Sequence, residues 1–142
     1  MVKKVKEKKE FVLTVGKRKR AIARAKIQAG IGKVIINSKP LETWGTEIWR
    51  LYIKEPLILA GDLANKIDIY VNVRSGGIAG QAEAIRQAIA KGLVEFFKDK
   101  KLKEKFMQYD RNLLVYDPRR TEPHKPSRSK AGARRHKQRS KR

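Results

Sequence analysis

The chain has 142 residues, with 36 Lys and Arg against 14 Asp and Glu, which gives a formal charge of +22. A charge of this size excludes a protein that acts without an acidic partner. No cysteine is present, so disulfides, thiolate nucleophiles and the usual zinc knuckles are excluded, and a reducing intracellular setting fits.

The first half of the chain predicts mainly β-structure. Residues 1–10 form a lysine-rich arm that we expect to be disordered without its partner. The β pattern begins at Phe11, and from Arg20 to Gln28 small or apolar residues alternate with basic ones, which predicts a strand with one basic face. A turn at 30–32 leads to a second strand over 34–36, so we expect a β-hairpin, with another turn at 37–40.

The second half predicts helices around one further strand. Apolar residues from Trp44 to Tyr52 recur at helical spacing, and Pro56 is expected to open or break the next short helical piece. Residues 67–74 alternate cleanly and predict a strand. From Ile78 to Phe96 the spacing predicts a long amphipathic helix. Its polar side is expected to hold Gln81, Arg86, Gln87, Lys91 and Glu95.

The globular pattern ends soon afterwards. Residues 98–105 predict a charged turn or helix, and 113–116 a last short strand. Residues 1–26 and 117–142 each carry 11 basic and 2 acidic side chains, net +9, whereas the residues between them carry 14 and 10, net +4. We therefore expect a disordered basic arm (1–10), a globular core (11–116) and an extended basic tail (117–142) that orders only on a partner.

The sequence gives little indication of membrane insertion or of catalysis. The apolar runs at 11–15 and 56–60 are too short for a signal-peptide core or a bilayer span, which indicates a cytoplasmic protein. His124 and His136 lie in the tail, where no packed shell could orient an imidazole. Asp110 is expected to pair with Arg111 or to cap a turn rather than act as a base. No metal-ligand spacing occurs, so no cofactor or metal is expected.

The glycine-rich junction at 76–81 allows more than one interpretation. It lies where a strand leads into a helix and could present backbone N–H groups to phosphate. A dinucleotide fingerprint would need glycine at Ser75, and a Walker loop would need Lys and Ser or Thr at Gln81 and Ala82. A tight structural turn and close approach to an RNA backbone are the favoured alternatives, and the two are compatible.

Two basic segments are the stronger candidate sites. Residues 17–26 carry six positive charges, and such side-by-side charges repel unless an anion lies against them. In the tail, arginines outnumber lysines, and arginine binds phosphate bidentately and stacks on bases. The few aromatic residues do not suggest a stacking platform for single strands. Structured RNA is the expected partner.

Three separated motifs carry a resemblance to a known family. They are Ser75 to Arg86 (SGGIAGQAEAIR), Gly16 to Ala25 (GKRKRAIARA) and the final Ser140-Lys141-Arg142. Together they resemble the small-subunit ribosomal protein nine family, over nearly the whole chain from Phe11 onward. The segment 117–123 (DPRRTEP) looks like its archaeal branch.

The resemblance implies a fold, a role and partners. The implied fold is α+β: a two-layer split β-α-β domain with a left-handed crossover, a sheet of about four strands with helices on one face, and a long disordered basic tail. The implied role is structural, in the head of the small subunit, with the tail tip on the anticodon stem of peptidyl-site transfer RNA. Ribosomal RNA, that transfer RNA and neighbouring head proteins such as proteins ten and fourteen are the implied partners.

The expected site residues follow from the basic segments and from the resemblance. We expect ribosomal RNA contacts from Lys17, Arg18, Lys19, Arg20, Arg24, Lys26, Arg74, Gly76, Gly77, Gln81, Arg119, Arg120, Lys125, Arg128, Lys130, Arg134 and Arg135. The resemblance implies transfer RNA contacts from Arg139, Ser140, Lys141 and Arg142. A free basic RNA chaperone or nucleic-acid compaction protein is the alternative, and a nucleotide-dependent enzyme is the least favoured hypothesis.

Overall fold

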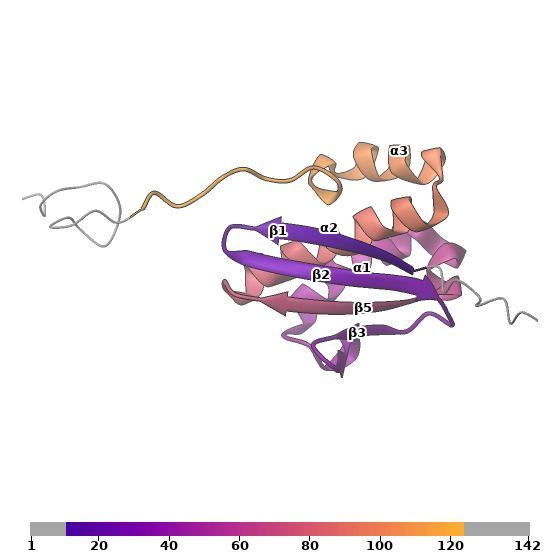
Figure 1. Ribbon diagram of the computed structural model, residues 1–142, viewed down its shortest axis with the longest axis horizontal. Helices are drawn as coiled ribbons and strands as arrows, with labels where there is room; N and C mark the ends of the chain where they lie inside the picture. Colours follow the sequence, from indigo (N-terminus) through magenta and orange to yellow (C-terminus); the bar gives the residue numbers. More distant parts are fainter. Residues whose placement is uncertain (1–10, 124–142) are drawn as a thin grey trace, which may run out of the picture.

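The computed structural model describes residues 11–123, which form one five-stranded sheet with helices on a single face (Figure 1). The strands are β1 (Phe11–Arg18), β2 (Ala21–Ala29), β3 (Val34–Ile36), β4 (Lys39–Pro40) and β5 (Ile67–Arg74). The helices are α1 (Glu47–Ala60), α2 (Ile78–Phe97) and α3 (Lys100–Tyr109), with 3-10 turns at Leu41–Thr43, Gly61–Lys66 and Arg111–Leu113. The expected arm (1–10) and the tail from 124 to 142 lie outside the described residues.

The strand order across the sheet is β1-β2-β5-β3-β4, and β3 and β5 are parallel neighbours. Their connection contains α1 and passes behind the sheet in the view of Figure 1, which makes the crossover left-handed. The α+β class, the one-sided helical layer and the crossover agree with the expected fold. The sheet has one strand more than expected, because the two-residue β4 pairs with β3 across a turn at Asn37 and Ser38.

Alternation along β2 and β5 sets the two faces of the sheet. Ala21, Ala23, Ala25 and Ile27 of β2 are buried, and the odd-numbered residues of β5 are buried beside them. Alanine at three successive inward positions lets α2 lie close to the sheet. The core therefore sits between the sheet and α2, and within residues 11–123 no helix covers the other face of the sheet (Figure 1).

Glycine at position 16 permits the closest contact between β1 and α2. A Cβ atom at Gly16 would lie 1.9 Å from the backbone oxygen of Ala84. Nearby, the Thr14 hydroxyl donates a buried hydrogen bond to the Ala88 carbonyl at 2.8 Å. The edge strand is thereby fixed to the helix layer as well as to β2.

The expected hairpin of the strands at 20–28 and 34–36 is wrong, because β5 lies between β2 and β3. The loop at 30–33 crosses the start of β5 and is held there. The carboxylate of Asp68 accepts hydrogen bonds from the backbone N–H groups of Ile31 and Lys33, each at 3.0 Å. These bonds keep the pKa of the Asp68 carboxyl below its ordinary value and place β3 on the far side of β5.

Two further expectations need correction. Pro56 does not break the helical region, because α1 runs unbroken from Glu47 to Ala60 and buries Pro56 and Ile53 against the core. Tertiary packing here outweighs the backbone hydrogen bond that proline cannot make. Residues 113–116 form no strand: a 3-10 turn ends at Leu113, whose side chain is fully buried without sheet pairing.

Candidate RNA interface

The uncovered face of the sheet presents basic and polar side chains from β2 and β5. Ile22 lies opposite Arg74, Arg24 opposite Asn72, and Lys26 opposite Tyr70. We call these six exposed residues the open sheet face. Three cations on neighbouring positions of one face concentrate positive potential there.

The open sheet face is hollowed rather than flat. One hollow of about 190 Å³ is lined by Ile22, Arg24, Asn72, Arg74 and Ser75. A second, of about 370 Å³, lies beside Leu13, Lys26 and Tyr70. The Lys26 ammonium also lies 5.1 Å from the centre of the Phe11 ring, so one aromatic side chain accompanies the cations.

A second basic cluster lies where the β1–β2 turn meets the start of α2. Lys19 has a φ of 50° at the tip of the turn, and it and Arg20 are exposed. The loop before α2 packs against this turn: a Cβ atom at Gly76 would lie 3.0 Å from the Ala21 backbone nitrogen. We call Lys19, Arg20, Arg74, Gly76 and Gly77 the tip cluster. The fold thus unites two glycine- or arginine-rich motifs that are far apart in sequence.

The helix end inside the tip cluster is open to an anion. Gly77 precedes α2 without a side-chain cap, and the first turn of the helix has no acidic residue. Nothing lies within 4 Å of a Cβ atom placed at Gly77. The Gln81 side-chain amide donates to the Ser75 carbonyl at 3.1 Å and so supports the loop before α2. Unpaired N–H groups and the helix dipole favour negative charge at such an end.

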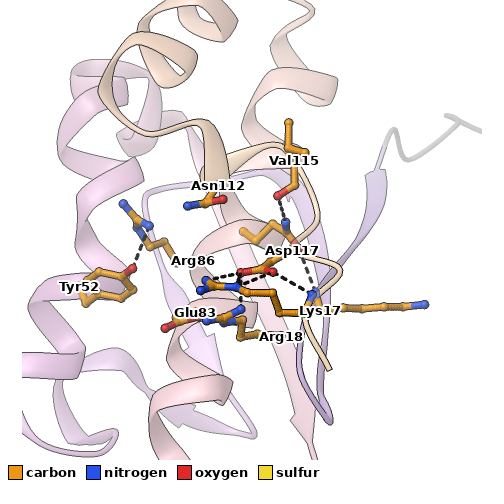
Figure 2. Close-up of a pocket in the computed structure, with 10 residues that line it drawn as sticks. Lys17, Arg18, Tyr52, Glu83, Arg86, Asn112, Val115 and Asp117 are labelled. Atoms are coloured by element: carbon orange, nitrogen blue, oxygen red, sulfur yellow. Dashed lines mark hydrogen bonds and ion pairs between the residues drawn. The ribbon is translucent and has the colours of Figure 1, made fainter. Parts of the chain in front are cut away.

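Arg18 behaves differently from its basic neighbours. Its guanidinium forms ion pairs with Glu83 of α2 and with Asp117, and its side chain is only 16% exposed. Figure 2 shows the side chains of Arg18, Glu83 and Asp117 close together. Asp117 also accepts from Arg119, whose Nη2 lies 2.6 Å from Oδ2 and whose backbone nitrogen lies 2.9 Å from Oδ1. We call Arg18, Glu83, Asp117 and Arg119 the tail-base clasp.

The clasp strongly favours the ionised form of its central carboxyl. The Arg119 side chain, then its backbone N–H, and more weakly Arg18 hold the pKa of Asp117 well below its ordinary value of 3.8. The reciprocal effect raises the pKa of Arg119. Arg18 is therefore neutralised within the fold, although the sequence grouped it with the RNA ligands.

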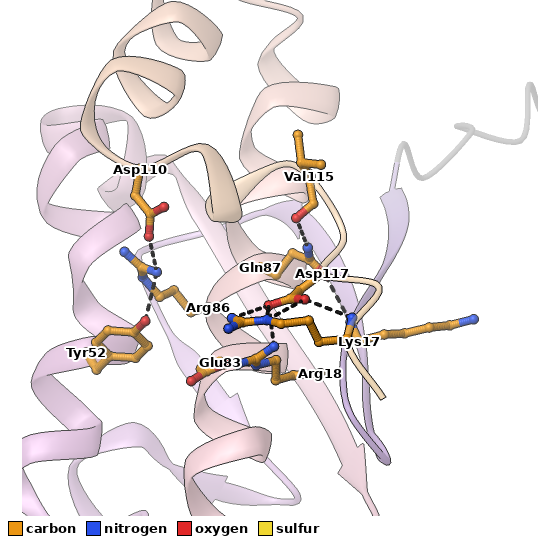
Figure 3. A network of polar contacts seen from close by, with 10 residues as sticks. Lys17, Arg18, Tyr52, Glu83, Arg86, Gln87, Asp110, Val115 and Asp117 are labelled. Carbon is orange, nitrogen blue, oxygen red and sulfur yellow. Dashed lines mark hydrogen bonds and ion pairs between the residues drawn. The ribbon is translucent and has the colours of Figure 1, made fainter. Parts of the chain in front are cut away.

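Gln87 and Arg86 of α2 make two further sets of polar contacts near the clasp (Figure 3). The Gln87 side chain accepts from the Lys17 backbone N–H at 2.9 Å and donates to the Val115 carbonyl at 2.8 Å. It thereby ties β1 to the segment that leaves the core. Arg86 lies 2.5 Å from Glu55 and 2.8 Å from Asp110.

Arg86 is buried yet charged. Burial alone would lower the pKa of its guanidinium, but the hydrogen bond to Asp110 and the neighbouring Tyr52 and Glu55 outweigh burial and raise it. The Tyr52 hydroxyl lies 3.0 Å from Arg86 Nη1, and burial raises the pKa of that hydroxyl. Asp110 caps the following turn through the Asn112 backbone N–H at 2.8 Å, but it pairs with Arg86 rather than with Arg111.

The expected polar side of α2 is thus partly wrong. Arg86 and Gln87 are each only 5% exposed, because the helix is covered on that side by α1 and by the segment after α3. A helical wheel shows which face is apolar but not whether a second layer covers the polar one. The helical spacing therefore could not predict that Arg86 and Gln87 are buried and make polar contacts with other elements.

The remaining expected site residues divide into two groups. Lys17, Arg119 and Arg120 are exposed near the clasp, and the Arg120 guanidinium lies 5.4 Å from the centre of the Tyr116 ring. The others lie outside the described residues: Lys125, Arg128, Lys130, Arg134, Arg135, Arg139, Ser140, Lys141 and Arg142.

Residues 11–123 contain neither a candidate metal site nor a candidate membrane span. Within that range, no group of three or more His, Asp or Glu side chains could hold a metal ion. No helix in the same range is long and apolar enough to cross a membrane.

Comparison with known proteins gives long and consistent matches. A family model described as ribosomal protein S9/S16 matches residues 16–142. The small ribosomal subunit protein uS9 of Pyrobaculum aerophilum is 53% identical over 131 residues, which is 92% of each chain. The protein of the same name from Methanococcus maripaludis strain C7 is 51% identical over 131 residues, covering 92% of this chain and 98% of the relative. Both relatives are archaeal, in agreement with the branch suggested by residues 117–123.

Proposed function

The chain belongs to the ribosomal protein S9/S16 family, and on that premise we propose that it binds ribosomal RNA in the head of the small subunit and reaches peptidyl-site transfer RNA through its C-terminal segment. It is a small-subunit ribosomal protein, a structural class rather than an enzyme class. The cytoplasm is the corresponding location.

The tip cluster is the observation that carries the RNA-binding part of the proposal. Exposed cations from the β1–β2 turn and from β5 surround an uncapped helix N-terminus with two exposed glycines. A phosphate group there could accept backbone N–H bonds and face arginine at once. The open sheet face continues this surface through Arg24 and Lys26.

The fold refines the roles that we propose for individual residues. Lys17, Lys19, Arg20, Arg24, Lys26, Arg74, Gly76 and Gly77 are proposed as direct ribosomal RNA contacts, as are Arg120 and the basic residues from Lys125 to Arg135. Gln81 is proposed to support the loop. Arg18 and Arg119 are proposed to hold the base of the tail, and Arg119 is 74% exposed so that it can also face RNA.

The tail has the length for a distant contact. The 26 residues from Asp117 to Arg142 span at most about 85–95 Å when fully extended. The clasp fixes one end of this segment to β1 and α2. Arg139, Ser140, Lys141 and Arg142 at the other end are proposed to contact the anticodon stem, and proteins ten and fourteen are proposed neighbours in the head.

Removing Ser140 to Arg142 tests the transfer RNA contact. Small subunits with the shortened chain should assemble normally but bind peptidyl-site transfer RNA about threefold to tenfold more weakly in filter-binding assays, because two cations are lost near phosphate. A chain with Lys141→Arg and Arg142→Lys keeps the charge and serves as the control. If subunits with the shortened chain bind transfer RNA as tightly as the parent, the proposed contact of the last residues with transfer RNA is wrong.

Sedimentation distinguishes the alternative, a free RNA chaperone. A ribosomal protein should co-sediment with small subunits through moderate salt, whereas a non-specific binder should be released as salt rises. Stoichiometric release at modest salt, together with equal binding to any duplex, would favour the chaperone.

A further inference from the structure

The outer side of α1 carries an exposed apolar stripe. Ile48 is 74% exposed, Leu51 is 56% exposed and Ile58 is 70% exposed. Their spacing of three and seven residues places them on one side of the helix, while Ile53 and Pro56 on the other side are buried. We call Ile48, Leu51 and Ile58 the α1 stripe. Exposed aliphatic groups that recur along one helix face are typical of a contact surface.

The charge around the α1 stripe is opposite to that of the rest of the protein. Residues 41–65 contain four acidic and two basic side chains, net −2, in a chain of +22. Of the four acids, Glu42, Glu47 and Asp62 are exposed. Both basic residues are only partly exposed, and Arg50 is directed to the Glu42 backbone carbonyl. Lys105 of α3 donates to the Leu59 carbonyl at 2.6 Å, so one cation from outside this range also reaches α1. The exposed carboxylates still make this surface better suited to a positively charged partner than to RNA phosphate.

A hollow at the end of the stripe offers an anchoring position. It measures about 360 Å³ and lies between α1 and the start of β3. Its lining includes Val34, Leu41, Leu57 and Ile58, with Glu42 and Lys54 as the charged members. An apolar side chain, or the methylene stem of a lysine or arginine with its charge near Glu42, suits such a lining.

We propose that the α1 stripe and this hollow form the docking surface for a basic protein in the assembled small subunit. This proposal rests on the proposed function, because it requires that the chain be assembled into the small subunit. In Figure 1, α1 lies behind the sheet, so the docking surface is on the opposite side from the open sheet face. One chain can therefore hold RNA on one side and a basic protein on the other, because the two sides differ in charge as well as in polarity.

Photocrosslinking in purified subunits tests the identity of the occupant. Full-length chains carry benzoylphenylalanine at position 51 or at position 58, and small subunits that contain them are isolated before irradiation. Position 107 on α3, where Met107 is 41% exposed, serves as the matched control. The expected product is an RNase-resistant adduct with a protein that mass spectrometry identifies as rich in Lys and Arg.

Three other outcomes overturn the proposal. They are an adduct with RNA, an adduct with an acidic protein, and a yield at both positions no higher than at position 107. Incorporation of the labelled chain into subunits is scored first, so failure of the subunit assignment is seen separately from failure of the docking surface.

The sign of the charge provides a second measurement. Ile48→Lys should lower the yield of the adduct from position 51 roughly tenfold, because it sets like charges against each other. Ile48→Glu removes the same apolar group but keeps the attraction, so its yield should fall by no more than about threefold. Equal losses for the two substitutions would contradict a basic partner.

Discussion

The tip cluster and the tail-base clasp each contain an arginine from the basic segment 17–26, but the two arginines have different surroundings. Arg20 is exposed beside Gly76 and Gly77, whereas Arg18, two residues earlier, is paired with Glu83 and Asp117. The difference shows that arginines close together in the sequence can have different surroundings in the fold. An arginine such as Arg18, which is mostly buried and paired with two carboxylates, is less available to phosphate than an exposed one such as Arg20.

The largest expected effect is at Arg86, because its buried guanidinium pairs with two carboxylates inside the fold. Arg86→Met should lower the free energy of unfolding of the full chain by about 2–4 kcal/mol, since Glu55 and Asp110 would lose their partner in a partly buried site. Chemical denaturation measures this change. Arg111→Met, at an exposed position, should stay within about 0.5 kcal/mol of the parent, and equal losses would contradict the assignment.

Arg18 and Arg20 allow the comparison to be tested directly. Arg18→Met should destabilise the fold by about 1–2 kcal/mol, because it breaks two partly buried ion pairs. Arg20→Met should leave stability within about 0.5 kcal/mol but weaken RNA binding and reduce its salt dependence by about one phosphate contact. Chemical denaturation measures the effect on stability, and binding to small-subunit RNA at several salt concentrations measures the effect on RNA contact. If Arg20→Met lowered stability and Arg18→Met weakened RNA binding, the roles assigned to the two arginines would be wrong.

The smallest expected effect concerns the protonation of Asp117. Its folded-state pKa lies below the ordinary 3.8, so the contribution of the clasp is fully present above that value and is lost as pH falls through the folded-state pKa. Carboxyl ¹³C NMR should therefore give a titration midpoint well below 3.8. Arg119→Met should raise this midpoint more than Arg18→Met, because Arg119 is the larger cause. An ordinary midpoint would show that the clasp is open in solution.

Local patterns predicted the parts of the fold that depend on neighbouring residues. Alternation along residues 67–74 and helical spacing from Ile78 identified β5 and α2, because burial of one face repeats along each element. The place of β3 beyond β5 was missed, because it depends on Asp68 binding a loop more than 30 residues earlier in the chain. Similarly, Pro56 stays helical only through packing that the sequence pattern does not contain.

In the candidate site, too, features set by neighbouring residues were predictable and features set by distant contacts were not. Charge density drew attention to residues 17–26 as a candidate RNA contact, and most of their cations are exposed in the structure. Arg18 was grouped with them, because its partners lie far along the chain, Asp117 being 99 residues away. Gln87 was expected at the surface, although its amide joins Lys17 to Val115. These roles arise from contacts between elements and leave no periodic signal.

The attachment of Asp117 has a mechanical consequence. A pull along the chain beyond the clasp is transmitted through Arg18 to β1 and through Glu83 to α2, and Gln87 holds Val115 just behind. Because β1 and α2 meet backbone to backbone at Gly16, the load divides between sheet and helix layer. A pull on the chain beyond Asp117 would therefore reach β1 and α2 before it reached the Arg111–Leu113 turn and α3.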